Sequence, residues 1–298
     1  GTEVTPVSVT SVLPTTTGTH DVTFASPSGK TTITVKANVI ESNVTVTAND
    51  IVMTLLEAQN TTETELITKT NAIATTINAG ATASVNIEAT EVSKLTDLVT
   101  APMSSIQLII NGQDTNGDVS QTSVNVYVYD AVNPADQEAM NATDFVIGLS
   151  DVSADNFISY AGAKAYDISV LPAVEITPVT VVSPIPSTTG IHNVTFASPT
   201  GKTTITVEAH IYDVVNPIDA MNAHDFAIAL ADVSEANFIQ YAEAKAYDIS
   251  TLPGVEVTPV TVTSVMPTTL GIHDVTFASP RGKTTITVKA EVMSRIHK

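Results

Sequence analysis

The sequence contains no cysteine and no tryptophan, and basic residues are scarce. Without cysteine, a disulfide-built scaffold is excluded. The 12 Lys and Arg residues stand against 31 Asp and Glu, a net charge of −19. So acidic a surface repels phosphate, so we expect neither nucleic acid nor an anionic membrane as a partner. No run of apolar residues approaches the roughly 18 that a membrane-spanning helix needs, so we expect no membrane insertion.

One stretch of sequence occurs three times. It runs from Gly18 to Ala37 and returns, with few changes, as Gly190 to Ala209 and Gly271 to Ala290. The Phe residues inside these copies indicate a period of about 81 to 86 residues, which is typical of a tandem array of modules.

The repeated stretch has the pattern of a β-hairpin. Val22 and Phe24 alternate with polar neighbours, and Ile33 and Val35 continue the alternation after residues 26–30. Alternation of period two and β-branched residues predict strands, and the Pro and Gly between them predict a turn. One apolar face and one Thr- and Lys-bearing face indicate an antiparallel sheet with one side on a core.

A second pattern precedes each hairpin. Ala-x-Asp followed by Phe or Ile recurs, and about ten residues later Ser or Thr begins a segment with helical spacing. Thr62 with Glu65 forms a capping-box pattern. We predict helices over about Ser153 to Lys164 and Ser234 to Lys245, and strands over Phe145 to Leu149 and Phe226 to Leu230.

These patterns divide the chain into four parts. Residues 1–41 are predicted to be the C-terminal, incomplete half of a module, residues 42–129 a divergent module, and residues 130–212 and 213–298 two close copies. With about five strands and one short helix per module, the predicted fold is mainly β. We expect a tandem array of small immunoglobulin-like β-sandwich modules, each with one short helix.

The order of these motifs resembles tandem bacterial immunoglobulin-like repeats of cell-surface and S-layer-associated proteins. The strongest part of the resemblance is Val-Thr-Phe at residues 22–24, 194–196 and 275–277. The resemblance implies a secreted, extracellular stalk, spacer or adhesive array. Neither a Leu-Pro-x-Thr-Gly sorting signal nor a surface-layer-homology segment occurs in these residues, so the resemblance does not explain how the protein is anchored.

The sequence therefore favours a structural extracellular protein, a repeat-built subunit of a cell-surface stalk, S-layer or filament. One alternative is a filament subunit that polymerises by strand complementation at the incomplete first module. Another is an adhesin that binds carbohydrate or a host protein, which 5% aromatic residues support poorly. We expect no enzyme, since no Gly-x-Ser-x-Gly motif is present.

Two sets of site residues follow from these patterns. Strands that lack their leading partners have free edges, so we expect self-association with identical subunits or neighbouring modules. The residues predicted for that assembly site are Val4, Val7, Val9, Val22, Phe24, Ile33 and Val35. Asp114, Asn116 and Asp118 place oxygen ligands at alternate positions, as at the start of a calcium loop.

The calcium assignment has an alternative. The loop should end in a bidentate Glu, and that position is Asn125. Strands on both sides instead favour a hairpin turn. No other cofactor is expected. The aligned residues His20, His192 and His273 are interpreted as turn-adjacent or strand side chains, because ligation of one metal would require separate modules to converge.

Overall fold

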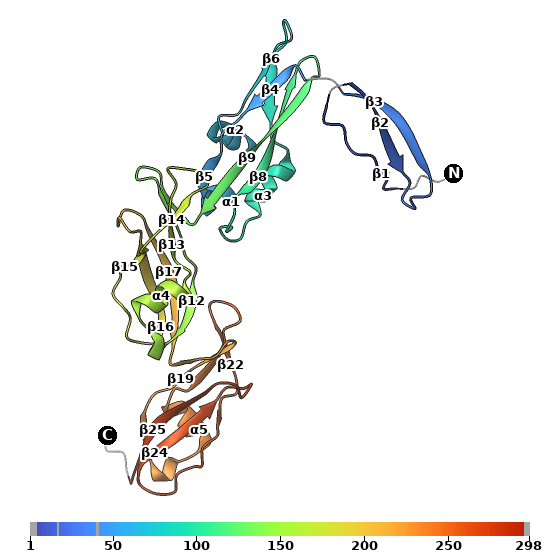
Figure 1. The fold of residues 1–298 in the computed structure, drawn as a ribbon. Coiled ribbons are helices and arrows are strands. Elements are labelled where there is room, and N and C mark those ends of the chain that lie inside the picture. The colour runs from blue at the N-terminus through green and yellow to red at the C-terminus, as the bar shows by residue number, and fades with distance from the viewer. Residues whose placement is uncertain (1–4, 17, 40–41, 295–298) are drawn as a thin grey trace. The chain divides into compact units, whose positions relative to one another are not determined.

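The computed structural model describes residues 5–16, 18–39 and 42–294 (Figure 1). Over these residues the chain is mainly β and forms tandem β-sandwich modules. It divides into two units. One comprises Gly1–Ile51, Thr61–Asp97 and Ile106–Val126, and the other Val52–Asn60, Leu98–Ser105 and Tyr127–Lys298. Each sheet formed by the described strands lies inside one of the four ranges expected from the repeats. The number of independently folding domains stays a prediction.

The repeated hairpin is confirmed in its first copy. Strands β1 (Ser8–Val9), β2 (Gly18–Ala25) and β3 (Thr32–Val39) form an antiparallel sheet in the order β1-β2-β3. Phe24 lies opposite Ile33, and Val22 lies opposite Val35, so one face collects the apolar side chains. Strand β1 covers only two residues, and Val4, one of the predicted assembly residues, lies outside the described residues.

The divergent range 42–129 contains two sheets and more helix than expected. The strand orders are β4-β6 and β5-β9-β8-β7. The strands are β4 (Val44–Thr47), β5 (Ile51–Thr54), β6 (Ile73–Thr76), β7 (Ala83–Asn86), β8 (Ile106–Asp114) and β9 (Val119–Tyr129). Three α-helices replace the single one expected: α1 (Leu55–Gln59), α2 (Glu63–Lys69) and α3 (Ala89–Thr96). The capping box of Thr62 and Glu65 is confirmed at the start of α2.

The range 130–212 forms two four-stranded sheets, in the orders β10-β11-β13-β14 and β12-β17-β16-β15. Its elements are β10 (Ala131–Asn133), β11 (Glu138–Asn141), β12 (Phe145–Gly148), the 3₁₀ turn η1 (Leu149–Asp151), α4 (Ala154–Tyr160), β13 (Lys164–Asp167), β14 (Val174–Ile176), β15 (Thr180–Val181), β16 (Gly190–Ala197) and β17 (Thr204–Tyr212). Strand β12 pairs with β17 in parallel. The alternating pattern of the hairpin had predicted an antiparallel sheet, so this parallel strand pair was not expected from the sequence.

The last range repeats this arrangement element by element, with β20 parallel to β25. Its elements are β18 (Val214–Val215), β19 (Asp219–Asn222), β20 (Phe226–Ala229), η2 (Leu230–Asp232), α5 (Glu235–Tyr241), β21 (Lys245–Asp248), β22 (Val255–Val257), β23 (Thr261–Val262), β24 (Gly271–Ala278) and β25 (Thr285–Met293).

Each of these two modules has a core that joins its helix to both sheets. In the first of them the rings of Phe145 and Phe157 lie 5.4 Å apart, and Phe157 and Phe196 are fully buried. The last module repeats the pair, with Phe226 and Phe238 at 5.2 Å. Aromatic rings of this kind contribute much of the apolar surface that a small module buries. None of the helices that the structure describes is long and apolar enough to cross a membrane.

Both helices begin where predicted but end sooner. Ser153 and Ser234 are the N-caps, whereas α4 and α5 end at Tyr160 and Tyr241. Of the residues expected in the last helical turn, only Lys164 and Lys245 enter strands, as the first residues of β13 and β21. The chain leaves each helix through a residue with positive φ, Gly162 at +56° and Glu243 at +48°. Glycine adopts this left-handed conformation without the steric cost that a Cβ brings.

The two copies therefore offer a matched stability test. We expect Glu243→Gly to raise the free energy of unfolding of its module by roughly 0.5–1 kcal/mol, since it relieves strain at positive φ. Gly162→Ala, the reciprocal change, should lower it by a similar amount. Calorimetric unfolding of each variant measures the effect. A destabilised Glu243→Gly chain would contradict this account.

Candidate assembly site

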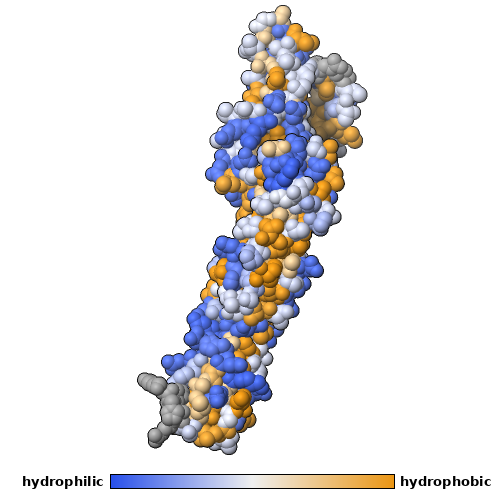
Figure 2. Space-filling model, turned by 90° about the vertical axis from the view of Figure 1, so that its left-hand side faces the viewer, coloured by the Kyte–Doolittle hydropathy of each residue, from blue (hydrophilic) through white to orange (hydrophobic). Residues whose placement is uncertain are grey.

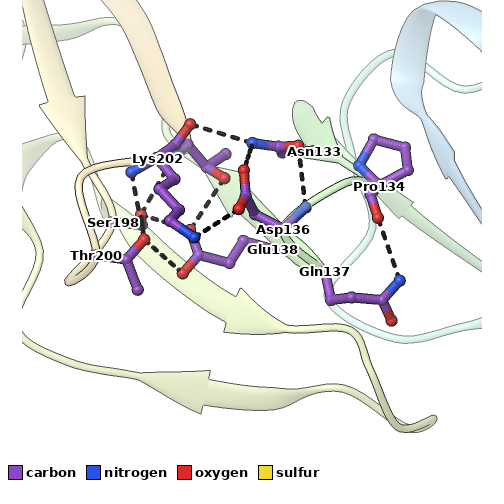
Figure 3. A network of polar contacts seen from close by, with 9 residues as sticks. Asn133, Pro134, Asp136, Gln137, Glu138, Ser198, Thr200 and Lys202 are labelled. Atoms are coloured by element: carbon purple, nitrogen blue, oxygen red, sulfur yellow. Dashed lines mark hydrogen bonds and ion pairs between the residues drawn. The ribbon is translucent and has the colours of Figure 1, made fainter.

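A buried carboxylate joins the two sheets in the module of residues 130–212 (Figure 3). Glu138, at the start of β11, is only 4% exposed. It accepts hydrogen bonds from Ser198 Oγ at 2.6 Å, Thr200 Oγ1 at 2.8 Å and Thr203 Oγ1 at 3.1 Å. All three hydroxyls belong to the loop between β16 and β17. We call this carboxylate and its donors the inter-sheet latch.

The hydroxyls determine the charge state of the latch. Burial raises the pKa of Glu138, but the hydrogen bonds from Ser198, Thr200 and Thr203 outweigh it, and the pKa falls below its ordinary value of 4.5. Around the latch, Lys202 Nζ lies 2.7 Å from Asp136 Oδ1, and Asn133 Nδ2 donates to the Lys202 carbonyl at 3.1 Å. The exposed ion pair contributes little energy, so the buried carboxylate is the principal polar link.

The last module keeps the latch with a shorter acid. Asp219, 1% exposed, accepts from Ser279 Oγ at 3.1 Å and from Arg281 Nη1 at 3.2 Å. The second guanidinium nitrogen of Arg281 bonds Asp248 at 2.5 Å. Hydrogen bonds from Ser250, and then from Arg281, lower the pKa of Asp248 to about 2. Arg281 occupies the repeat position of Thr200 in the module of residues 130–212. Both side chains donate to the buried acid of their module, so different residues link the two sheets in the same way.

In the divergent module the acid and the hydrogen-bond donors of the latch exchange places: the hairpin carries the acids, and the other sheet carries the donors. Here the acids flank the turn between β8 and β9: Asp114 is the last residue of β8, and Asp118 directly precedes β9. Asp114, 5% exposed, accepts from Thr76 Oγ1 at 2.8 Å and from Asn78 Nδ2 at 2.7 Å. Asp118 accepts from Asn78 and from Asn43, each at 2.8 Å. The donors come from or beside β4 and β6, so in this module too the turn is tied to the opposite sheet.

This turn contains the residues predicted for calcium. Asp114 Oδ1 accepts the backbone N–H groups of Asn116 and Asp118 at 2.9 and 3.0 Å. Burial raises the pKa of Asp114, but its hydrogen bonds outweigh that effect and lower it. The amide of Asn78 donates to both acids, and an NH₂ group is not a metal ligand. In the part of the chain that is described, no three acidic, His or Cys side chains are grouped so that they could hold a metal ion. The geometry favours the hairpin-turn alternative, and the calcium assignment stays a prediction.

The Asp of the recurring Ala-x-Asp pattern has a separate role, which its recurrence alone does not explain. Asp144 accepts the backbone N–H of Glu208 at 2.8 Å. In the same way Asp225 accepts the backbone N–H of Lys289, and Asp50 accepts the backbone N–H of Asn125, each at 2.7 Å. In 130–212 and 213–298 this Asp stands one residue before the strand that pairs in parallel. In the sequence, the signal for this role was the recurrence of one Asp directly before an apolar strand.

The three aligned histidines lie in strands, each as the third residue of β2, β16 or β24, which agrees with the strand alternative. His20, His192 and His273 each place Nε2 2.8–2.9 Å from the carbonyl oxygen of the Thr four residues earlier. Each ring therefore holds the chain where it enters a strand of its own module.

The first sheet has the apolar face of a module without a full cover. Ile33 and Val35 are 64% and 41% exposed, whereas Ile286 and Val288, at the same repeat positions, are 7% and 5% exposed. Of the other residues predicted for assembly, Val7 and Val9 are exposed, Phe24 is partly buried, Val22 is buried, and Val4 is not among the described residues. Elsewhere the visible surface mixes hydrophobic and hydrophilic residues without strict separation (Figure 2).

The first sheet also has the donors of a latch without its acid. Ser26 and Thr31 align with Ser198 and Thr203, which are buried on Glu138. Thr31 is exposed, and Ser26 Oγ bonds Ser28 Oγ at 3.2 Å. Among the residues described, neither hydroxyl has a carboxylate partner.

The sequence matches no protein-family model and no curated protein. Among solved structures, the M60 catalytic domain of Clostridium perfringens ZmpB with its CBM51 domains is 11% identical, at a TM-score of 0.23. Domains 4–9 of the surface layer protein SbsC are 14% identical, at 0.21, and Drosophila N-cadherin EC1-3 is 11% identical, at 0.18. The alignments cover 93%, 94% and 83% of this chain. They span 33%, 55% and 98% of the three structures. Identities and TM-scores this low assign no family to the chain.

The latch predicts a pH-dependent stability. A folded-state pKa below 4.5 means that Glu138 stabilises its module fully above about pH 4.5, and that this contribution is lost as the pH falls through the lowered pKa. We expect Glu138→Gln to cost about 1–3 kcal/mol at neutral pH and to flatten this acid dependence. Calorimetry between pH 7 and pH 3 measures both effects.

Glu175→Gln is the matched control, since Glu175 makes an exposed ion pair with Lys164. It should change the free energy of unfolding by less than about 1 kcal/mol. Equal effects of the two substitutions would show that the buried latch has no special weight.

Proposed function

We propose that this chain is a structural protein outside the cell, a repeat-built subunit of a cell-surface stalk, S-layer or filament. One observation carries the proposal: the polar side chains that recur from module to module are occupied in holding each module together. Glu138 and Asp219 join sheets, Asp144 and Asp225 begin parallel strands, and the aligned histidines bind nearby carbonyl groups.

The proposal includes no catalytic activity. A surface hollow of about 470 Å³ lies beside α5, β21 and β22. Its charged groups include Lys245 and Glu256, which pair with each other at 3.2 Å. The acidic surface instead supports solubility of an exposed array.

Localisation tests the proposal. We expect antibodies against this chain to label the outside of intact cells that make it in immunogold electron microscopy. Protease treatment of intact cells should remove the label, with a cytoplasmic protein as the control that survives. Label confined to the cell interior would overturn the proposal.

A second candidate is a filament subunit that polymerises by strand complementation. The observation that favours it is the open first sheet, since an uncovered sheet edge pairs readily with a strand from another chain. Under this candidate the purified chain should form ordered filaments of micrometre length in electron micrographs. A monodisperse monomer at high concentration, with and without calcium, would contradict polymerisation.

A further inference from the structure

The ring that ends the module of residues 130–212 packs against the module of residues 213–298. Tyr212 is the last residue of β17, and its ring centroid lies 4.9 Å from that of Tyr247 in β21. Tyr212 is only 8% exposed, so the junction removes most of this side chain from water. The same pair recurs earlier in the second unit, where Tyr129 at the end of β9 lies 5.1 Å from Tyr166 of β13.

The residue after this ring is an Asp that ties the chain to the next strand. The backbone N–H of Asp213 donates to Asn222 Oδ1 at 2.9 Å. In return, Asp213 Oδ2 accepts the backbone N–H of Ala223 at 3.0 Å. Two hydrogen bonds on one residue fix the direction in which the chain leaves β17. The other junction has the same two bonds, made by Asp130 with Asn141 and Ala142.

The last module has a slot for the ring of Tyr212, formed by Tyr247, Ile249 and Gly254. A Cβ on Gly254 would lie 2.6 Å from Tyr212 Oη and 3.0 Å from Ile249 Cγ2. Both separations are shorter than ordinary van der Waals contact. The φ of Gly254 lies outside the left-handed region, so its backbone conformation does not require glycine. The space that a side chain would need is therefore taken up first of all by a ring from the preceding module.

The side chains of the junction are not a general requirement of this strand arrangement. In the divergent module, the register of β4 and β6 places Thr47 and Thr75 at the positions of Asn222 and Tyr247. Neither Thr supplies an aromatic ring or an amide. The slot is thus a feature of particular modules, in addition to what the fold itself needs.

We propose that Tyr212 and its slot couple the modules of residues 130–212 and 213–298, so that each stabilises the other and the two unfold together. The energy comes from aromatic surface that is buried only when both modules are folded. In a linear array, such a nearest-neighbour interaction makes adjacent modules cooperative. The inference goes beyond the proposed function, because coupling is measured on the purified chain wherever the protein is located.

Native-state hydrogen exchange on the full chain, read by mass spectrometry, tests the coupling. In the unaltered chain we expect the amides of β17 and β25 to lose protection at the same urea concentration. Tyr212→Ala should lower the protection of β25 about fivefold or more, although β25 belongs to the other module. Tyr241→Ala is the matched control, since Tyr241 is 41% exposed at the end of α5. It should leave the protection of β17 unchanged.

A double-mutant cycle tests the contact atom by atom. Gly254→Ala places a methyl group against Tyr212 Oη, so it should lower the protection of β17 about fivefold or more. Tyr212→Phe removes that oxygen and keeps the ring against Tyr247. In the Tyr212→Phe chain, Gly254→Ala should therefore have a clearly smaller effect on β17. Comparison of the two backgrounds cancels the effect of the methyl group on the unfolded chain and on Ile249.

Three results would overturn the inference. One is loss of protection of β17 and β25 at clearly different urea concentrations in the unaltered chain. Another is a Tyr212→Ala effect confined to β16 and β17, which would make Tyr212 a core residue of its own module alone. The third is an equal effect of Gly254→Ala in both backgrounds. If Tyr212→Ala prevents its own module from folding, the cycle decides, because its substitutions are small.

Discussion

The buried carboxylate on each hairpin loop determines how the two sheets of a module meet. A charge removed from water is costly unless hydrogen-bond donors surround it, so Glu138 requires Ser198, Thr200 and Thr203 beside it. The divergent module satisfies the same requirement with the acid on the opposite side, at Asp114. The acid can lie on either sheet, because the stabilising energy depends on the pairing of the carboxylate with its donors and not on which sheet bears the charge.

This constraint changes the meaning of the first sheet. Its loop and apolar face are those of half a sandwich, and half a sandwich exposes both hydroxyl donors and hydrophobic side chains. A sheet with one apolar face is stable when another layer covers that face. Within the described residues, the features that stabilise the complete modules therefore lie exposed on the first sheet.

Much of the fold could be predicted from local patterns. Alternation at Val22 and Phe24 predicted the hairpin, and Ser153 and Ser234 predicted where helices begin, because strand pleat and N-cap act over a few residues. The helix ends were predicted too late. A left-handed residue at Glu243 has no residue-type signal, and the following strand is stabilised by its partner in the sheet. The extra helices of the divergent module were missed because no second copy was there for comparison.

By itself, the sequence determined the repeat period, the β-rich modules and the positions of the hairpins. These follow from spacing and residue type along the chain. The tertiary structure alone decided that β12 runs parallel to β17, that Asp144 accepts from Glu208, and that Glu138 lies on a loop 60 residues away. Such contacts join segments distant in sequence, and their energy comes from burial and mutual pairing, which no local pattern records.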